Sequence, residues 1–215
     1  MSSIDEHYPQ DCAFCKISEA YPPSSSSPVP SSPDPDKVSP QCHLLLSTPY
    51  VLAFLDILPI AAGHVLLTAR HHYRKLSDIN NTSPTTTTTA KGGSSQPTPE
   101  HAAETARQLG AWLPVVSRAL CAVTGIEDWN IVQNNGERAA QVVPHVHFHL
   151  IPRYQEGRKD LSTKGRVDVG MLKSWKMFGR GAREELDDEE GAELAALLRK
   201  AIETEVESVR EKAKL

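Results

Sequence analysis

Histidines and apolar residues alternate strictly in one stretch of the chain, between Pro144 and Pro152. Three histidines occupy every second position and apolar residues lie between them: His145, Val146, His147, Phe148, His149 and Leu150. A period of two is typical of a β-strand whose two faces meet different surroundings. The pattern predicts that the apolar side chains face a core, because a slip of one residue would bury all three imidazoles.

Short apolar runs predict the other strands of a sheet, at 42–47, 50–56, 63–68 and 129–134. The first two runs are separated by Thr48 and Pro49, which predicts a hairpin. The strand that carries the histidines is expected to extend over 141–153, after a turn at Asn135 and Gly136.

Apolar positions three and four residues apart predict two helices. The first has Thr98 as its N-cap and Pro99 at its first helical position, and it ends at Gly125. Pro114 should kink it, because proline removes one hydrogen bond. The second helix is expected to pack on the domain or on a partner chain, through a stripe of Leu194, Leu197, Leu198, Ile202, Val206 and Val209. The fold class is therefore α+β, with an antiparallel sheet of about five strands, one main helix and an added C-terminal helix.

Two tracts of low complexity interrupt this pattern, at about 21–40 and 80–99. Their Ser, Pro, Thr and Gly residues bury too little apolar surface to offset the entropy of ordering. We expect surface insertions, the first of them disordered and placed between two strands. The whole chain divides into a flexible N-terminus at 1–10, one domain at 11–155 that contains both insertions, and a C-terminal extension at 156–215.

The composition argues against nucleic acid and membranes as partners. The formal net charge is −4 and the isoelectric point is about 6.1, so there is no general basic footprint. No apolar run approaches the roughly 20 residues that cross a bilayer. A small-molecule ligand fits this composition better than a nucleic acid or a membrane does. The first residues lack the features of a secretory signal, so we expect an intracellular protein, in the cytoplasm with the nucleus as a further location.

Cys12 and Cys15 form a Cys-x-x-Cys pair, a spacing at which two thiolates of one tight loop can hold one zinc ion. Intracellular cysteines stay reduced, so metal binding ranks ahead of a disulfide here. Two further ligands are needed, and a histidine of the basic cluster that includes His71 and His72 could supply one.

Histidines on one strand face suggest chemistry at phosphorus. Neutral imidazole is a competent nucleophile near neutral pH, and neighbouring imidazoles can donate hydrogen bonds to phosphate oxygens. His147 is flanked on both sides and is the best placed attacker. A catalytic metal held by all three histidines is the alternative, but the outer two would lie roughly 13 Å apart along the strand.

The segment from His145 to Ile151 resembles the His-φ-His-φ-His-φ-φ signature (φ is apolar) of the histidine triad (HIT) superfamily of nucleotide hydrolases and transferases. Further blocks are similar to family blocks in the family's order, at 12–17, 53–59, 63–66 and 133–136. The resemblance covers roughly residues 11–155. It implies a HIT-like fold, a purine nucleotide such as AMP as ligand, and a homodimer whose two sheets join edge to edge.

The resemblance also implies a role for individual residues. His147 would attack the α-phosphate and carry the nucleotide as a covalent intermediate, while His149 and Asn134 would hydrogen-bond the phosphate. His64 would line the same pocket. The other implied nucleotide contacts are Phe14, Phe54 and Ile57 around the base, Asp56 at the ribose hydroxyls, and Gln141.

The same resemblance implies a structural zinc ion held by Cys12, Cys15, His72 and His145. His145 would otherwise support the histidine array through a hydrogen bond, and the two roles compete. We favour zinc for His145.

Within the superfamily, the chain is most similar to the histidine triad nucleotide-binding (Hint) branch, which cleaves adenosine monophosphoramidates. Asn134 favours this branch over the fragile-histidine-triad branch, which hydrolyses dinucleoside polyphosphates. Val142 occupies a position where both branches usually carry Ser or Thr near the leaving group. Its lack of a hydroxyl leaves open a third possibility, a catalytically weak nucleotide-binding or zinc-stabilised interaction protein.

Overall fold

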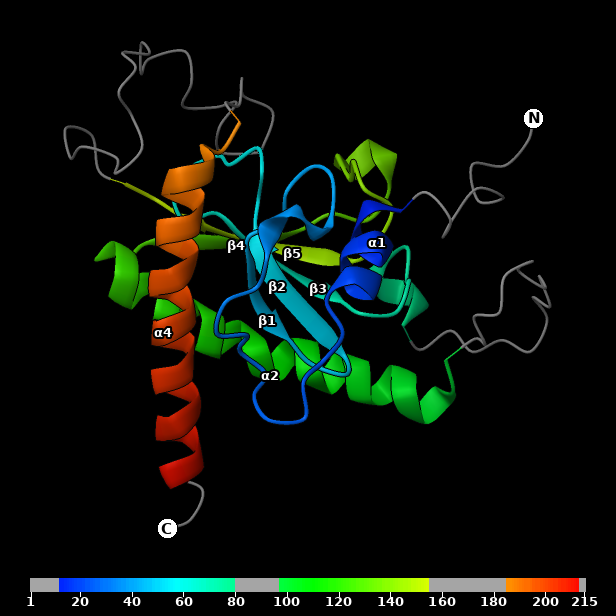
Figure 1. The fold of residues 1–215 in the computed structure, drawn as a ribbon. Coiled ribbons are helices and arrows are strands. Elements are labelled where there is room, and N and C mark those ends of the chain that lie inside the picture. Colours follow the sequence, from blue (N-terminus) through cyan, green and yellow to red (C-terminus); the bar gives the residue numbers. More distant parts are fainter. Residues whose placement is uncertain (1–11, 80–96, 155–184, 213–215) are drawn as a thin grey trace.

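The computed structural model describes residues 12–79, 97–154 and 185–212. Its centre is an antiparallel sheet of five strands in the order β1-β2-β3-β5-β4 (Figure 1). The strands are β1 (Leu44–Ser47), β2 (Val51–Leu55), β3 (Val65–Ala69), β4 (Trp129–Gln133) and β5 (His147–Pro152). The α-helices are α1 (Ala13–Ala20), α2 (Pro99–Thr124) and α4 (Asp188–Lys212). The predicted fold class and the hairpin of the first two strands are confirmed.

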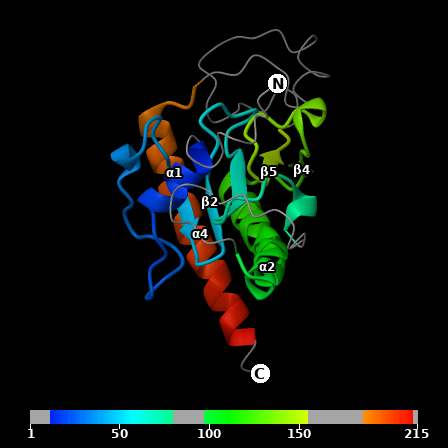
Figure 2. The same cartoon turned by 90° about the vertical axis from the view of Figure 1, so that its right-hand side faces the viewer.

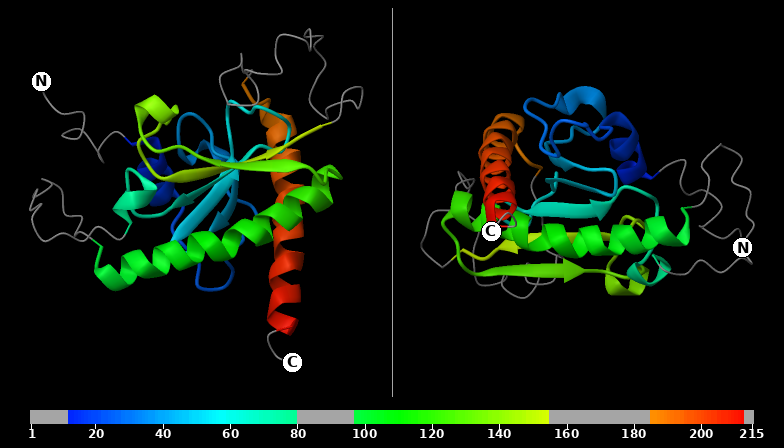
Figure 3. Two further views of the ribbon diagram at one scale, coloured as in Figure 1. Left: turned by 180° about the vertical axis from the view of Figure 1, so that it is seen from behind. Right: turned by 90° about the horizontal axis from the view of Figure 1, so that it is seen from below.

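Side chains of β2 alternate between two apolar clusters, one on each face of the sheet. Val51, Ala53 and Leu55 pack in a cluster with residues of α2 and α4. Leu52 and Phe54 pack in a second cluster with residues of α1. Figure 3 shows α2 lying across the sheet with α1 on the far side. Because both faces are covered, every residue of β2 is buried and the strand is a continuous apolar run in the sequence.

Helix α2 begins and ends where the sequence predicted. The Thr98 hydroxyl accepts a hydrogen bond from the backbone N–H of His101 at 3.3 Å, which satisfies a donor of the first turn. Gly125 ends the helix in the left-handed conformation, with φ of 66°. Pro114 lies inside the helix.

The two N-terminal cysteines lie at the start of a helix and not in a tight loop. Cys12 is the N-cap of α1, and Cys15 is in its first turn. Phe14 and Ile17, three residues apart, are the buried positions of this helix. The apolar spacing therefore already contained the signal for α1.

The first low-complexity tract also differs from its prediction, because it connects α1 to β1 and not two strands. Its main chain joins the sheet where the N–H of Ser47 donates to the carbonyl of Pro28 at 2.8 Å. Tyr21 and Val29 are buried and anchor the segment to the two clusters. Buried apolar side chains and backbone hydrogen bonds thus dock this polar tract on the domain.

The strand with the histidines is shorter than predicted and begins at His147. The residues before it form a turn, in which the Gln141 side chain accepts a hydrogen bond from the backbone N–H of Gly136 at 2.6 Å. The backbone N–H of His145 donates inside this turn, to the carbonyl of Val143 at 2.8 Å. His145 therefore lies outside the strand, whereas Phe148 and Leu150 face the cluster under α2 as expected.

The predicted C-terminal helix is α4, and it packs on the domain itself, against α2 and β1 (Figure 2). Ala195, Leu198 and Ile202 are its buried positions. The buried stripe is narrower than predicted, because Leu197 and Val209 are 56% and 46% exposed. None of the helices in the described ranges is long and apolar enough to cross a membrane.

Several expectations lie outside the described residues. These are the flexible N-terminus, nearly all of the second insertion, and the first half of the C-terminal extension.

Replacing Leu198 by alanine should lower the free energy of unfolding by about 2–5 kcal/mol, because it leaves a cavity between α4 and the sheet. Leu197→Ala, the neighbouring position on the exposed side, should change it by less than about 0.5 kcal/mol. Urea unfolding followed by circular dichroism measures both. Equal effects of the two substitutions would contradict the docking of α4 described above.

Candidate functional site

Helix α1, the loop after β2 and strand β5 surround a cavity of about 1160 Å³. Seven of the residues predicted to bind a nucleotide line it: Phe14, Phe54, Asp56, Ile57, Asn134, His147 and His149. Typical ligand pockets have about 300–1,000 Å³, so this one has room for a nucleotide and a group attached to it.

His147 and His149 share the face of β5 that is turned toward the cavity. In the sheet register they lie opposite Thr68 and Leu66 of β3. Nδ1 of His147 lies 2.6 Å from the backbone carbonyl of His145. Because a carbonyl only accepts, Nδ1 must donate, and the lone pair of the neutral ring is on Nε2. Burial lowers the pKa of His147, which favours this neutral form.

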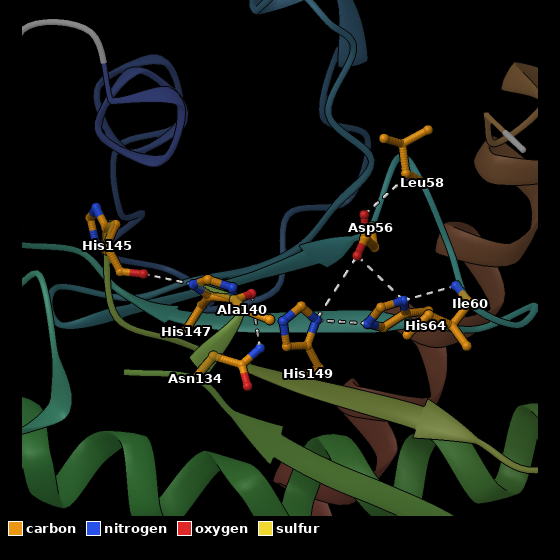
Figure 4. Close-up of polar contacts among 9 residues, drawn as sticks. All are labelled: Asp56, Leu58, Ile60, His64, Asn134, Ala140, His145, His147 and His149. Atoms are coloured by element: carbon orange, nitrogen blue, oxygen red, sulfur yellow. Dashed lines mark hydrogen bonds and ion pairs between the residues drawn. The ribbon is translucent and has the colours of Figure 1, made fainter. Parts of the chain in front are cut away.

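A second set of contacts joins Asp56, His64 and His149 (Figure 4). Nε2 of His64 lies 2.9 Å from Nδ1 of His149. The backbone N–H of Ile60 donates to Nδ1 of His64 at 3.2 Å, so Nε2 of His64 carries the proton and donates to His149. Nε2 of His149 then carries a proton and can donate to a ligand oxygen.

The two oxygens of the Asp56 carboxylate have different partners. One oxygen accepts from the backbone N–H of Leu58 at 3.0 Å. The other lies 3.3 Å from Nδ1 of His64 and 4.0 Å from Nδ1 of His149.

Asn134 and Gln141, both predicted to bind the nucleotide, are placed differently. Asn134 lines the cavity, and its side-chain amide donates to the carbonyl of Ala140 at 3.5 Å (Figure 4). Gln141 is buried in the turn, where its amide also donates to the carbonyl of Arg74 at 2.6 Å. Both polar ends of Gln141 therefore bind backbone, and its role is to hold the turn before β5.

The four predicted metal ligands Cys12, Cys15, His72 and His145 come together, with their ligand atoms within 4.8 Å of one another. Sγ of Cys12 lies 3.4 Å from Nδ1 of His145, and Sγ of Cys15 lies 3.3 Å from Nδ1 of His72. Sulfur and nitrogen ligands of one tetrahedral zinc ion are about 3.5 Å apart. The hydrogen bond between the two sulfur atoms lowers the pKa of Cys12 and raises the pKa of Cys15, so the pair shares one proton, which metal binding would release.

His145 performs two tasks with different atoms, so the competition expected from the sequence does not arise. Its Nε2 lies 2.8 Å from the carbonyl of Ala69, which fixes the proton there and leaves Nδ1 for the cysteine pair. Its own backbone carbonyl accepts from His147. The three histidines are thus not equivalent members of one strand face.

Val142 lines the cavity and is 89% exposed. The position that the family usually gives to a hydroxyl is therefore at the cavity, and an isopropyl group occupies it.

The sequence reasoning missed part of the cavity wall. Ile17 of α1 and Val143 line it, as do residues 37–40 of the first low-complexity tract. The three-residue spacing from Phe14 could have identified Ile17. The tract carried no such signal, because its polar residues have no periodic pattern.

Comparison with known sequences agrees with this geometry. The sequence model of the HIT domain matches residues 38–156. Adenosine 5'-monophosphoramidase HNT1 of Saccharomyces cerevisiae is 32% identical over 145 residues, which are 67% of this chain and 64% of the yeast protein. Adenosine 5'-monophosphoramidase hnt1 of Schizosaccharomyces pombe is 31% identical over 67% of this chain and 76% of its own.

Solved structures share the fold. A hypothetical histidine triad nucleotide-binding protein of Sulfolobus tokodaii matches with a TM-score of 0.58 and 19% identity, over 90% of this chain and 93% of that one. A zinc-bound histidine triad family protein of Mycobacterium smegmatis matches with a TM-score of 0.54 and 21% identity, over 93% and 98%. This α+β chain with its paired strand histidines belongs to the HIT domain family.

Proposed function

We propose that the protein is a nucleotide hydrolase that cleaves adenosine 5'-monophosphoramidate-type substrates through a covalent bond to His147. The observation that carries the proposal is the 2.6 Å contact between Nδ1 of His147 and the carbonyl of His145, which leaves the lone pair on Nε2. The names of the two yeast relatives support the choice of substrate.

In the first step Nε2 of His147 forms a bond to the α-phosphorus, and the bond from phosphorus to the amine nitrogen breaks. The amine leaves with a proton, and the nucleotide stays on His147. Water then attacks the same phosphorus, AMP leaves, and His147 regains its lone pair. His149 donates a hydrogen bond from Nε2 to a phosphate oxygen, where charge develops.

The remaining contacts hold the nucleoside. Asp56 accepts hydrogen bonds from the ribose hydroxyls, and Phe14, Phe54 and Ile57 enclose the base. Val142 cannot hand a proton to the leaving group, because it has no hydroxyl. The amine therefore takes its proton from water or from an imidazole, and good leaving groups should react fastest.

Replacing His147 by alanine should reduce the release of AMP from adenosine 5'-phosphoramidate by on the order of a thousandfold or more, because the covalent route is lost. His101→Ala on α2 is the control and should keep its activity. Mass spectrometry of the wild-type protein quenched during turnover should find a nucleotidyl group on His147. Unchanged AMP release by the alanine variant would exclude the proposal.

The Cys/His cluster is suited to a structural zinc ion, which would hold the start of α1 against the segment before β5. Two thiolates and two imidazoles are a typical set for such sites, and the Ala69 carbonyl orients the ring of His145. The zinc-bound relative of M. smegmatis shows that a protein of this fold can bind the metal.

Purified wild-type protein should contain about one zinc ion per chain, and Cys12→Ser should contain a small fraction of that, because a tetrahedral site loses one of four ligands. Cys121→Ser, in helix α2, provides the matched control with full zinc content. Inductively coupled plasma mass spectrometry measures the metal. Equal zinc in all three proteins would rule out the cluster as the site.

For the assembly we infer a homodimer through β4, an edge strand of the sheet. Trp129 and Ile131 of β4 are 38% and 45% exposed and lie on the face of the sheet that α2 covers elsewhere. An exposed apolar edge strand is protected when a second copy covers it.

Ile131→Lys should convert the dimer into a monomer, because a charge would be buried in the interface. Leu197→Lys places the same charge on an exposed apolar position of α4 and should leave the mass unchanged. Light scattering after size-exclusion chromatography gives the mass. A wild-type monomer would refute the inferred assembly.

A further inference from the structure

The C-terminal segment lies beyond the residues that match the HIT domain, yet it reaches the wall of the cavity. The backbone N–H of Leu186, just before α4, donates to the carbonyl of Ile57 at 2.9 Å. Ile57 lines the cavity and directly follows Asp56. The extension is thus bonded to the chain on the C-terminal side of the carboxylate.

A second contact reaches the other side of Asp56. Gly191 of α4 lies so close to the His43 ring that a Cβ at this position would be 2.5 Å from Nε2 of His43. His43 is buried, and its carbonyl accepts from the backbone N–H of Leu55 at 3.1 Å. Leu55 directly precedes Asp56. Helix α4 therefore supports, through one intervening residue, the chain on the N-terminal side of the carboxylate.

Helix α4 is itself firmly held. The Arg199 guanidinium donates to the carbonyl of Leu44 in β1 at 3.0 Å, and Leu198 and Ile202 are fully buried. A well-packed helix is a rigid support, since interiors are as dense as organic crystals. An aspartate side chain is short, so the place of its carboxylate follows its backbone.

We propose that the segment from Leu186 to Gly191 positions Asp56, which makes the C-terminal extension part of the ribose subsite. This inference rests on the proposed function, in which Asp56 accepts hydrogen bonds from the sugar hydroxyls. A purely structural role for the extension would affect stability and overall activity, but not the preference for a sugar with hydroxyls.

The test uses the full chain and compares kcat/KM for adenosine 5'-phosphoramidate with that for its 2',3'-dideoxy analogue. Leu186→Pro removes the N–H donor. Gly191→Ala forces the His43 ring or the helix to move. Both variants should lower the ratio of the two kcat/KM values by about tenfold, through a higher KM for the ribose substrate, because hydrogen bonds to a carboxylate are lost. Turnover of the dideoxy analogue should change little.

Matched controls separate positioning from general damage. Leu186→Ala keeps the N–H but removes side-chain packing on the core, so it measures how much of the effect of Leu186→Pro is due to that packing. Gly110→Ala adds the same methyl group as Gly191→Ala to helix α2, where nothing lies within 4 Å of the new Cβ, and should keep the wild-type ratio. Asp56→Asn is the positive reference and should lower the ratio at least as much as the two test variants.

Each outcome decides one question. Absence of AMP release by the wild-type protein would reject the proposed function. Normal activity with an unchanged ratio in both test variants would overturn the positioning role alone. If Leu186→Pro fails to fold by circular dichroism, Gly191→Ala decides, because it disturbs the packing on His43 and leaves every backbone N–H donor in place.

Discussion

One buried residue, His145, contacts both the cysteine pair and the proposed nucleophile His147. Its ring meets the cysteine pair at the start of α1, and its carbonyl fixes the proton of His147. The carbonyl of Ala69 at the end of β3 holds the ring in place. A shift of His145 would disturb the Cys/His cluster and the proposed nucleophile at once.

The alternation of side chains along the strands places polar groups at the cavity and apolar groups in the core. Alternation along β2 sends one set of side chains to the cluster under α2 and the other to the cluster under α1. In β5 the same alternation turns His147 and His149 toward α1 and Leu150 toward α2. The two histidines therefore lie on the same face of the sheet as the apolar residues that pack against α1, and they line the cavity.

Helix α4 belongs to the folded core although it lies outside the residues that match the HIT domain. The HIT domain match ends at residue 156, but α4 completes the core through Leu198 and Ile202 and covers the β1 edge of the sheet. Arg199 binds a carbonyl of that edge strand, which a second chain could otherwise pair with. Helix α4 is an integral part of this fold, and Leu186, just before it, donates a hydrogen bond to the loop that follows Asp56.

The sequence by itself determined the strands, both long helices and the Cys-x-x-Cys pair, because period, capping residues and cysteine spacing are local properties. His72 and His145 were added to that pair only through the resemblance to the HIT superfamily. The sequence also placed His147 and His149 on one face of a strand. Only the tertiary structure decided that His145 leaves that face and that Gln141 binds backbone, since both depend on a turn closed by contacts between distant residues. The link from Leu186 to Ile57 joins residues far apart in the chain and has no local signature.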